Sequence, residues 1–325
     1  MVGFTGVGSL PGTDFPAALR LLLHDVGAVE GGLPHLPELP ARGPWADMIG
    51  RSLALLVDLP VSLDAGTWRL SDTAGLDARR AASTLRDDLD MLQEEAYEWS
   101  GPFKVQVAGP WTLAAALLRP LGGRVLADRS ARRDVAQSLA AGTSDFLQQV
   151  RARMPQAEVV LQVDEPGLPA VLAGGVPTEG GFFRHRRVDH PEAIEALAPL
   201  AALTPGAVLH CCASGYPIDL AVQAGFGAIG LDSDTVAGPD TVAEALDGGT
   251  GLHLGCLPTD VERGWTADDL AARAMTLLRP LELGDIEALT LTPACGLAGW
   301  SPKGAAAAYR ALGRAAPMVS EQLAR

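Results

Sequence analysis

The sequence predicts a single (β/α)8 barrel, in which parallel strands alternate with helices around a closed sheet. Short apolar runs that end in Gly, Pro or polar residues alternate with longer Ala-, Leu- and Arg-rich stretches of helical period, a pattern typical of repeated β-α units. No low-complexity linker interrupts residues 1–325. One barrel is therefore favoured over the alternative of two α/β halves that meet near Gly174–Gly181.

The predicted elements follow from these two periods. Eight apolar runs are predicted as strands: Phe4–Gly8, Val26–Glu30, Phe103–Ala108, Glu158–Val163, Ala207–Cys212, Ala228–Asp232, Gly251–Cys256 and Ala288–Pro293. Helices are predicted over stretches that open with Ser, Thr, Asp or Pro as start signals: Asp14–His24, Asp72–Trp99, Ser130–Met154, Pro191–Leu203, Ala267–Leu278 and Lys303–Glu321. The segment Gly31–Pro44 is rich in Pro and Gly and is predicted as an active-site loop.

Composition narrows the possible functions. The chain is 48% hydrophobic and 20% charged, without an apolar run near the roughly 18 residues that a membrane span needs. Met1–Thr5 does not open a secretory signal, so we expect a cytoplasmic protein. A net charge of −14 argues against nucleic acid or an anionic membrane as partner, because both are bound through clustered Lys and Arg. We expect a small-molecule substrate.

The four cysteines are too few for a disulfide scaffold and are expected to be core, metal-binding or catalytic thiols. In a strand, residues i and i+2 point to the same face, so His210 and Cys212 converge while Cys211 faces the opposite way. Cys295 follows the eighth predicted strand, and barrel closure brings it toward the fifth. Taken singly, a core histidine or a buried core thiol would be the better interpretation of His210 or Cys295; three strand-end positions together favour a metal site.

Asp232 ends the next predicted strand and can add an oxygen ligand. A set of His, Cys, Cys and carboxylate suits zinc at a catalytic site. The alternatives for Asp232 are a hydrogen bond to His210 or a helix cap, with Asp234 as a competing ligand. A thiol that coordinates zinc is deprotonated, so the pattern predicts activation of a substrate sulfur for attack on a methyl group.

With these residues in place, the sequence resembles the catalytic C-terminal barrel of cobalamin-independent methionine synthase. The motifs that carry the resemblance span nearly the whole chain: Gly6-Val7-Gly8-Ser9-Leu10-Pro11, Asp164-Glu165-Pro166, His210-Cys211-Cys212 and Pro293-Ala294-Cys295-Gly296-Leu297. The resemblance implies a Zn²⁺-dependent methyltransferase that converts homocysteine to methionine. It assigns His210, Cys212, Asp232 and Cys295 to the metal, although this family normally has Glu where Asp232 stands.

The resemblance also implies how the acceptor amino acid is bound. Ser9 would contact its carboxylate, and Asp164 and Glu38 its ammonium group. From the residues alone, Ser9 can equally be a turn or helix-start residue, and Glu38 an ordinary exposed glutamate. Glu165 can instead pair with an arginine or cap the segment that follows it.

The methyl donor is less well indicated. Family members tend to have an Asp-His pair after the seventh strand, whereas this chain has His253 earlier and Cys256 at the strand end; Cys256 is a weak candidate for a catalytic part. Methyltetrahydrofolate and methyl-corrinoid, free or on a corrinoid protein, are the expected donors. Trp111 could stack on a flat donor or be a buried helix-start aromatic.

Three other functions fit parts of the sequence. The acceptor could be another thiol, such as a coenzyme, methylated or alkylated from a corrinoid. A metal-free decarboxylase of the uroporphyrinogen type shares the barrel and would need a basic cluster, for which Phe182–Arg187 is the candidate. A non-catalytic zinc or sulfur carrier would keep the metal ligands without a substrate pocket.

Overall fold

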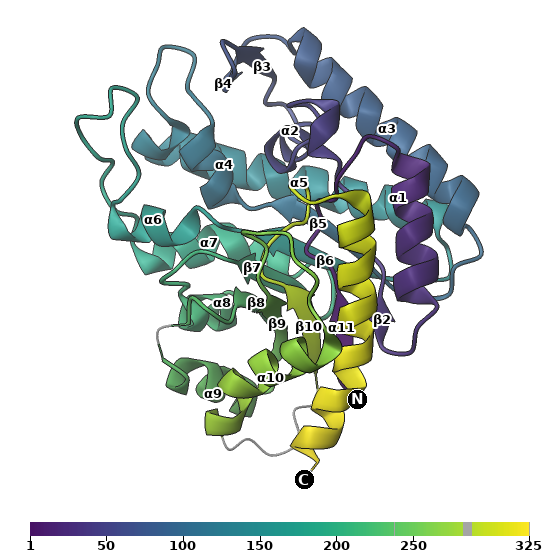
Figure 1. The fold of residues 1–325 in the computed structure, drawn as a ribbon. Helices are drawn as coiled ribbons and strands as arrows, with labels where there is room; N and C mark the ends of the chain where they lie inside the picture. The colour runs from purple at the N-terminus through teal and green to yellow at the C-terminus, as the bar shows by residue number, and fades with distance from the viewer. Residues whose placement is uncertain (237, 282–287, 325) are drawn as a thin grey trace.

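The protein is a nearly closed (β/α)8 barrel in the computed structural model, which describes residues 1–236, 238–281 and 288–324 (Figure 1). Parallel strands form an eight-stranded sheet in the order β2-β1-β10-β9-β8-β7-β6-β5. The strands of this sheet are β1 (Gly3–Thr5), β2 (Gly32–Leu33), β5 (Gly101–Ala108), β6 (Ala157–Asp164), β7 (Val208–Cys211), β8 (Ala228–Asp232), β9 (Gly251–Leu257) and β10 (Leu289–Pro293).

Backbone hydrogen bonds just beyond β2 close the ring. The Lys104 amide of β5 donates to the Pro34 carbonyl, and the Leu36 amide donates to the Lys104 carbonyl, both at 2.9 Å. Interior side chains from all sides of the ring therefore face one another. The carboxyl ends of the strands meet at one end of the barrel, where sites in this architecture lie.

Helices surround the sheet (Figure 1). The long C-terminal α11 runs beside α10 and β1. The α-helices within the described residues are α1 (Phe15–Leu21), α2 (Met48–Leu53), α3 (Leu76–Ala96), α4 (Pro110–Ala116), α5 (Arg129–Arg153), α6 (Leu168–Ala173), α7 (His190–Ala201), α8 (Ile218–Gln223), α9 (Asp240–Asp247), α10 (Ala267–Leu278) and α11 (Pro302–Leu323). None of the described helices is long and apolar enough to cross a membrane.

Most predicted elements are confirmed, and one strand is wrong. Val26–Glu30 is not a strand, because α1 continues as a π-helix over Leu22–Gly27. The second strand of the barrel is instead β2, which starts after Gly31 turns the chain at φ +77°. An apolar run this short cannot be assigned to helix or strand from its period alone.

A hairpin outside the barrel was not predicted. Strands β3 (Val61–Asp64) and β4 (Thr67–Leu70) pair antiparallel. Ala65 and Gly66 both have positive φ, at 46° and 79°, as a two-residue hairpin turn with right-handed twist requires. The Ala at the first of these positions hides the usual Asn-Gly or Asp-Gly signal.

Candidate active site

The polar residues inside the barrel are arranged by strand alternation. Asp164 of β6 is in register with His210 of β7, which is in register with Gly230 of β8. Asp232 follows two residues further along β8 and is in register with Gly255 of β9. Side chains from three neighbouring strands, β6, β7 and β8, are thus brought to one end of the barrel.

Two cysteines that are distant in sequence meet at this end. The Cys212 thiol donates to the Sγ atom of Cys295 across 3.6 Å. This hydrogen bond, with a second from the Gly296 amide, holds the pKa of Cys295 at about 6. The pKa of Cys212 is raised, first by the same hydrogen bond and then by burial. The predicted approach of the loop after β10 to the end of β7 is confirmed.

His210 is buried, with 5% of its surface exposed, and its Nε2 atom has no hydrogen-bond partner among the described residues. Burial, and after it the charge of Lys104, lowers its pKa to about 3. The imidazole is therefore neutral, and its Nε2 atom is available to bind a ligand. Gly230 makes room for this ring, since a Cβ atom there would lie 3.0 Å from the His210 Nδ1 atom.

Asp232 shares a cavity of about 720 Å³ with Cys212 and Cys295. Its Oδ1 atom accepts a hydrogen bond from the Asp234 amide at 3.0 Å. Burial raises the pKa of Asp232. The competing ligand Asp234 is instead held by Arg273, with two contacts of 2.5 and 2.6 Å.

The predicted ligand set is only partly assembled. Across residues 1–236, 238–281 and 288–324, no three His, Cys, Asp or Glu side chains are close enough together to enclose a metal ion. The paired thiols and the unpartnered His210 nitrogen nevertheless suit zinc, which takes nitrogen and sulfur ligands in tetrahedral geometry. The role of these four residues in metal binding stays a prediction.

The residues predicted to bind the acceptor amino acid lie next to the thiols. Ser9 forms an isolated parallel bridge with Glu38, and its carbonyl accepts from the Leu297 amide at 2.8 Å. A Cβ atom on Gly296 would come within 1.9 Å of the Ser9 Oγ atom. The Ser9 hydroxyl is thus packed directly against the loop that bears Cys295.

Glu38 and Asp164 are both 4% exposed, so Glu38 is not the exposed glutamate that the sequence also allowed. Burial comes first in raising the pKa of each carboxyl group. The charge of Glu38 then raises the pKa of Asp164 further. Arg51 Nε approaches Glu38 Oε1 at 3.9 Å and opposes the increase at Glu38. The charge of Lys104 lowers the pKa of both carboxyl groups, and a further cation beside them would do the same.

Glu165 has a structural position beside this pair. Its carboxylate accepts hydrogen bonds from the Trp111 and Thr112 amides and from the Thr112 hydroxyl, at 2.6 to 2.8 Å. It therefore caps the first turn of α4. Burial raises the pKa of Glu165 to about 7.

Two other predicted site residues are buried in the hydrophobic core. Cys256 is fully buried in the hydrophobic core, and burial raises its thiol pKa to about 12, which speaks against a part in catalysis. Trp111 is 2% exposed and donates from Nε1 to the Ala193 carbonyl of α7. This position favours the alternative of a buried helix-start aromatic.

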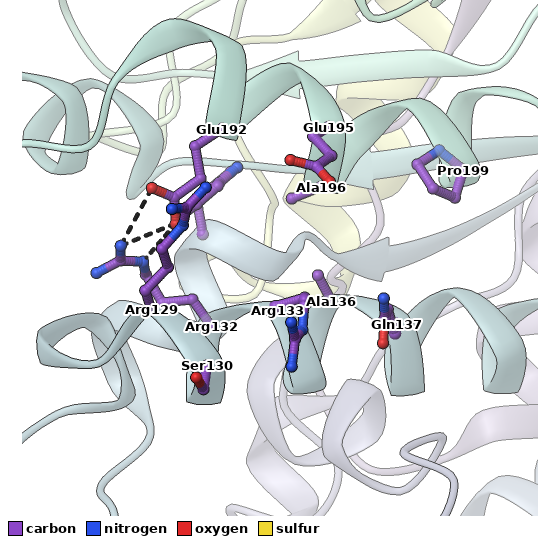
Figure 2. Close-up of a pocket in the computed structure, with 11 residues that line it drawn as sticks. Arg129, Ser130, Arg132, Arg133, Ala136, Gln137, Glu192, Glu195, Ala196 and Pro199 are labelled. Atoms are coloured by element: carbon purple, nitrogen blue, oxygen red, sulfur yellow. Dashed lines mark hydrogen bonds and ion pairs between the residues drawn. The ribbon is translucent and has the colours of Figure 1, made fainter.

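Trp111 instead lines a cavity of about 530 Å³. The other residues that line this cavity belong to α5 and α7 (Figure 2). Arg132 and Glu192 form an ion pair across it, with contacts of 2.8 and 3.1 Å. None of the cysteines lines this cavity.

Sequence reasoning missed the interior residues below the thiols. Lys104 and Gln162 are fully or almost fully buried, at 0% and 2% exposed, and both lie on barrel strands. Burial lowers the pKa of Lys104 to about 7, although the negative charges of Asp164 and Glu38 raise it. The available signal was a lysine within the otherwise apolar run Phe103–Ala108 and a glutamine two residues before Asp164.

These features define a (β/α)8 barrel with a paired-thiol site at the carboxyl ends of its strands. No family model and no curated protein matches the sequence. Among solved structures, a B12-independent methionine synthase from Shewanella sp. W3-18-1, in complex with selenomethionine, is similar over 100% of this chain and 99% of its own, with a TM-score of 0.66 and 14% identity. At that identity the similarity supports the fold. An endoxylanase of family GH10 from a sugarcane soil metagenome matches over 67% of this chain and 69% of its own, at 12% identity and a TM-score of 0.33, too low to bear on function.

Proposed function

We propose that this protein is a zinc-dependent methyltransferase that transfers a methyl group to the thiol of homocysteine, giving methionine. The observation that carries the proposal is the pair of Cys212 and Cys295 sulfurs, 3.6 Å apart, beside the buried carboxyl groups of Asp164 and Glu38. The full-length similarity to a methionine synthase that was solved with selenomethionine supports it.

Metal geometry supports the choice of zinc. Two sulfurs bound at about 2.3 Å to a tetrahedral zinc ion lie about 3.8 Å apart. The separation of 3.6 Å between Cys212 and Cys295 is close to that value. His210 would add nitrogen and Asp232 oxygen to the same ion.

The neighbouring residues account for an amino-acid acceptor. Glu38 and Asp164 would share the substrate ammonium group, which relieves the repulsion between the two carboxylates. The Ser9 hydroxyl, against Gly296, would contact the substrate carboxylate. A thiol without an ammonium group would leave these two carboxyl groups with only their protein partners, Arg51, Gln162 and Lys104, and this favours homocysteine over a coenzyme thiol.

The reaction needs little else from the protein. Zinc bound there would hold the acceptor sulfur as a thiolate, either as a fifth ligand or in place of one of the four protein ligands. Ser9, Glu38 and Asp164 would fix the substrate backbone, so that the sulfur faces the open cavity beside Cys212 and Cys295. A new sulfur–carbon bond forms as the bond between the methyl carbon and the donor breaks, and its electron pair leaves with the donor. Methyltetrahydrofolate and methyl-corrinoid are the donors to test.

The first experiment is zinc analysis of the purified protein, followed by reconstitution. Protein that binds no zinc after reconstitution would contradict the proposal. The second is methionine formation from homocysteine with methylcobalamin, methyltetrahydrofolate and its polyglutamate as donors. Asp164→Asn and Glu38→Gln should each raise KM for homocysteine by about tenfold or more, since each replaces a carboxylate partner of the ammonium group by a neutral amide.

Two alternatives predict different outcomes. A coenzyme-thiol transferase would be equally active in the Asp164→Asn variant. A metal-free decarboxylase would need the basic segment Phe182–Arg187 at its site. In that segment Arg184 donates to the Gly175 carbonyl, and Phe182 is 90% exposed, as in a solvated loop.

A further inference from the structure

Lys104 is one of two lysines in the chain, and it lies inside the barrel with no exposed surface. Its Nζ atom donates to the carbonyl oxygens of Gly6 and Val7, at 2.6 and 3.0 Å, and to the Gln162 Oε1 atom at 2.5 Å. An ammonium group has three N–H donors, so each of them has a partner.

These contacts fix the orientation of the Gln162 amide. Because Lys104 can only donate, the atom facing it must be the amide oxygen. The amide nitrogen then faces two acceptors, the Val7 carbonyl at 2.9 Å and the Asp164 Oδ1 atom at 2.8 Å. The Val7 carbonyl can only accept, so its contact with the Gln162 amide nitrogen requires the same orientation of the Gln162 amide. Asp164 therefore receives an N–H at Oδ1 and is held in one position.

The same ammonium group holds the segment that leads to Ser9. Its acceptors Gly6 and Val7 precede Ser9 by three and two residues in the motif Gly6–Pro11. Gly6 is packed tightly, since a Cβ atom there would lie 2.1 Å from the Tyr309 hydroxyl and 2.5 Å from His35 Nε2. The segment is thus clamped between Lys104 and the Tyr309–His35 pair.

We infer that Lys104 is a positioning residue for amino-acid recognition, because one side chain aligns both Asp164, through Gln162, and the Gly6–Ser9 segment. The inference rests on the proposed function, in which Asp164 binds the ammonium group and Ser9 the carboxylate of homocysteine. Lys104 itself need not contact the substrate. It acts as a specificity determinant: it makes an α-amino acid, and not merely a thiol, the preferred acceptor.

The test compares thiol binding to zinc-loaded protein by calorimetry, with homocysteine, 1-propanethiol and 4-mercaptobutanoate as ligands. Propanethiol keeps the sulfur and lacks both polar groups, and 4-mercaptobutanoate lacks only the ammonium group. In Lys104→Met, the preference for homocysteine over propanethiol should fall about tenfold or more, as expected when hydrogen bonds to charged groups are misaligned. Because propanethiol lacks both polar groups, its Kd should change less than about threefold. A factor of that size is a fraction of 1 kcal/mol.

Two further variants complete the design. Lys303→Met removes the other lysine, which is exposed on α11, and should leave every Kd unchanged. Gln162→Leu removes the link to Asp164 and one contact with the Val7 carbonyl, while Lys104 still donates to Gly6 and Val7. It should therefore weaken homocysteine more than 4-mercaptobutanoate. It tests the same chain of contacts if Lys104→Met does not fold.

The outcomes separate the two proposals. A folded Lys104→Met or Gln162→Leu variant that keeps the wild-type preference for homocysteine overturns the role of Lys104 alone. Wild-type protein that binds zinc but neither prefers homocysteine nor binds any of the thiols overturns the proposed function, and the role of Lys104 with it.

Discussion

Cys212 and Cys295 are 83 residues apart in the chain, yet their sulfur atoms lie 3.6 Å apart at the mouth of the barrel. Cys212 directly follows β7, and Cys295 lies in the loop after β10. Barrel closure, and not proximity in sequence, creates the pair. A tetrahedral zinc ion would place two cysteine sulfurs at about this separation.

If the pair holds zinc, removing one thiol should release the metal. We expect Cys295→Ser to lose most of its zinc on dialysis against a mild chelator, because a hydroxyl does not replace a thiolate as a zinc ligand. Cys211→Ala is the matched control: Cys211 is adjacent in sequence but fully buried in the core. Atomic emission measures zinc per chain in the two variants. A Cys295→Ser variant with one tightly held zinc would refute the assignment of Cys295 as a zinc ligand.

Gly230 should be needed for the position of the His210 ring. In Gly230→Ala, the new Cβ atom would lie 3.0 Å from Nδ1 and 3.3 Å from Cβ of His210, so the imidazole must move. We expect zinc affinity to fall by about tenfold, comparable with the loss when the groups around a metal ligand are altered. In Gly299→Ala, where a Cβ atom would meet nothing within 4 Å, affinity should be unchanged. Equal affinity in both variants would show that the His210 ring tolerates displacement or does not bind zinc.

Glu165 should make stability depend on pH. Its pKa is raised from the ordinary value of 4.5 to about 7, chiefly by burial, so the folded protein holds a proton that the unfolded chain releases. The stabilisation is complete below pH 4.5 and is lost as the pH rises through about 7. The free energy of unfolding should fall across this interval by at most about 1.4 kcal/mol per pH unit from this group.

Glu165→Gln should flatten that part of the profile, while Glu158→Gln, at an exposed position on β6, should leave it as in the wild type. Chemical unfolding at a series of pH values gives the comparison. An unchanged slope in Glu165→Gln would mean that Glu165 stays charged against its three hydrogen-bond donors.

The fold was predictable wherever a strand is an apolar run that ends in Gly, Pro or polar residues. Ala228–Asp232 was predicted as a strand and matches β8 residue for residue. Val26–Glu30 failed because Leu22–Gly27 continues the preceding helix through a π-turn, and local sequence does not distinguish the two. The two residues of β2 are held in place by barrel closure, a property of the whole ring.

Site residues were predictable where strand alternation alone places them. The proximity of Cys295 to Cys212 follows from barrel closure, whereas the convergence of His210 and Cys212 on one ion, expected from their spacing of two, stays a prediction. Burial of Glu38 depends on Arg51 of α2, which no local pattern links to it. Lys104 was missed because a lysine inside a barrel is stable only through partners on other strands, and those partners are visible only in three dimensions.

The choice between Asp232 and Asp234 as the oxygen ligand gives the last prediction. Asp232 shares the cavity of the thiol pair, whereas both carboxylate oxygens of Asp234 are engaged by Arg273. Asp232→Ala should therefore lower zinc affinity, and Asp234→Ala should cost at most about 1 kcal/mol of stability, as expected for an exposed ion pair. Competition with a colorimetric chelator measures the affinity, and thermal unfolding measures the stability. The reverse pattern, with zinc lost only in Asp234→Ala, would mean that Arg273 releases Asp234 to the metal. In Asp232→Glu, the longer side chain should reach the ion at least as well as Asp232 does, so this variant should retain zinc if the position is a ligand.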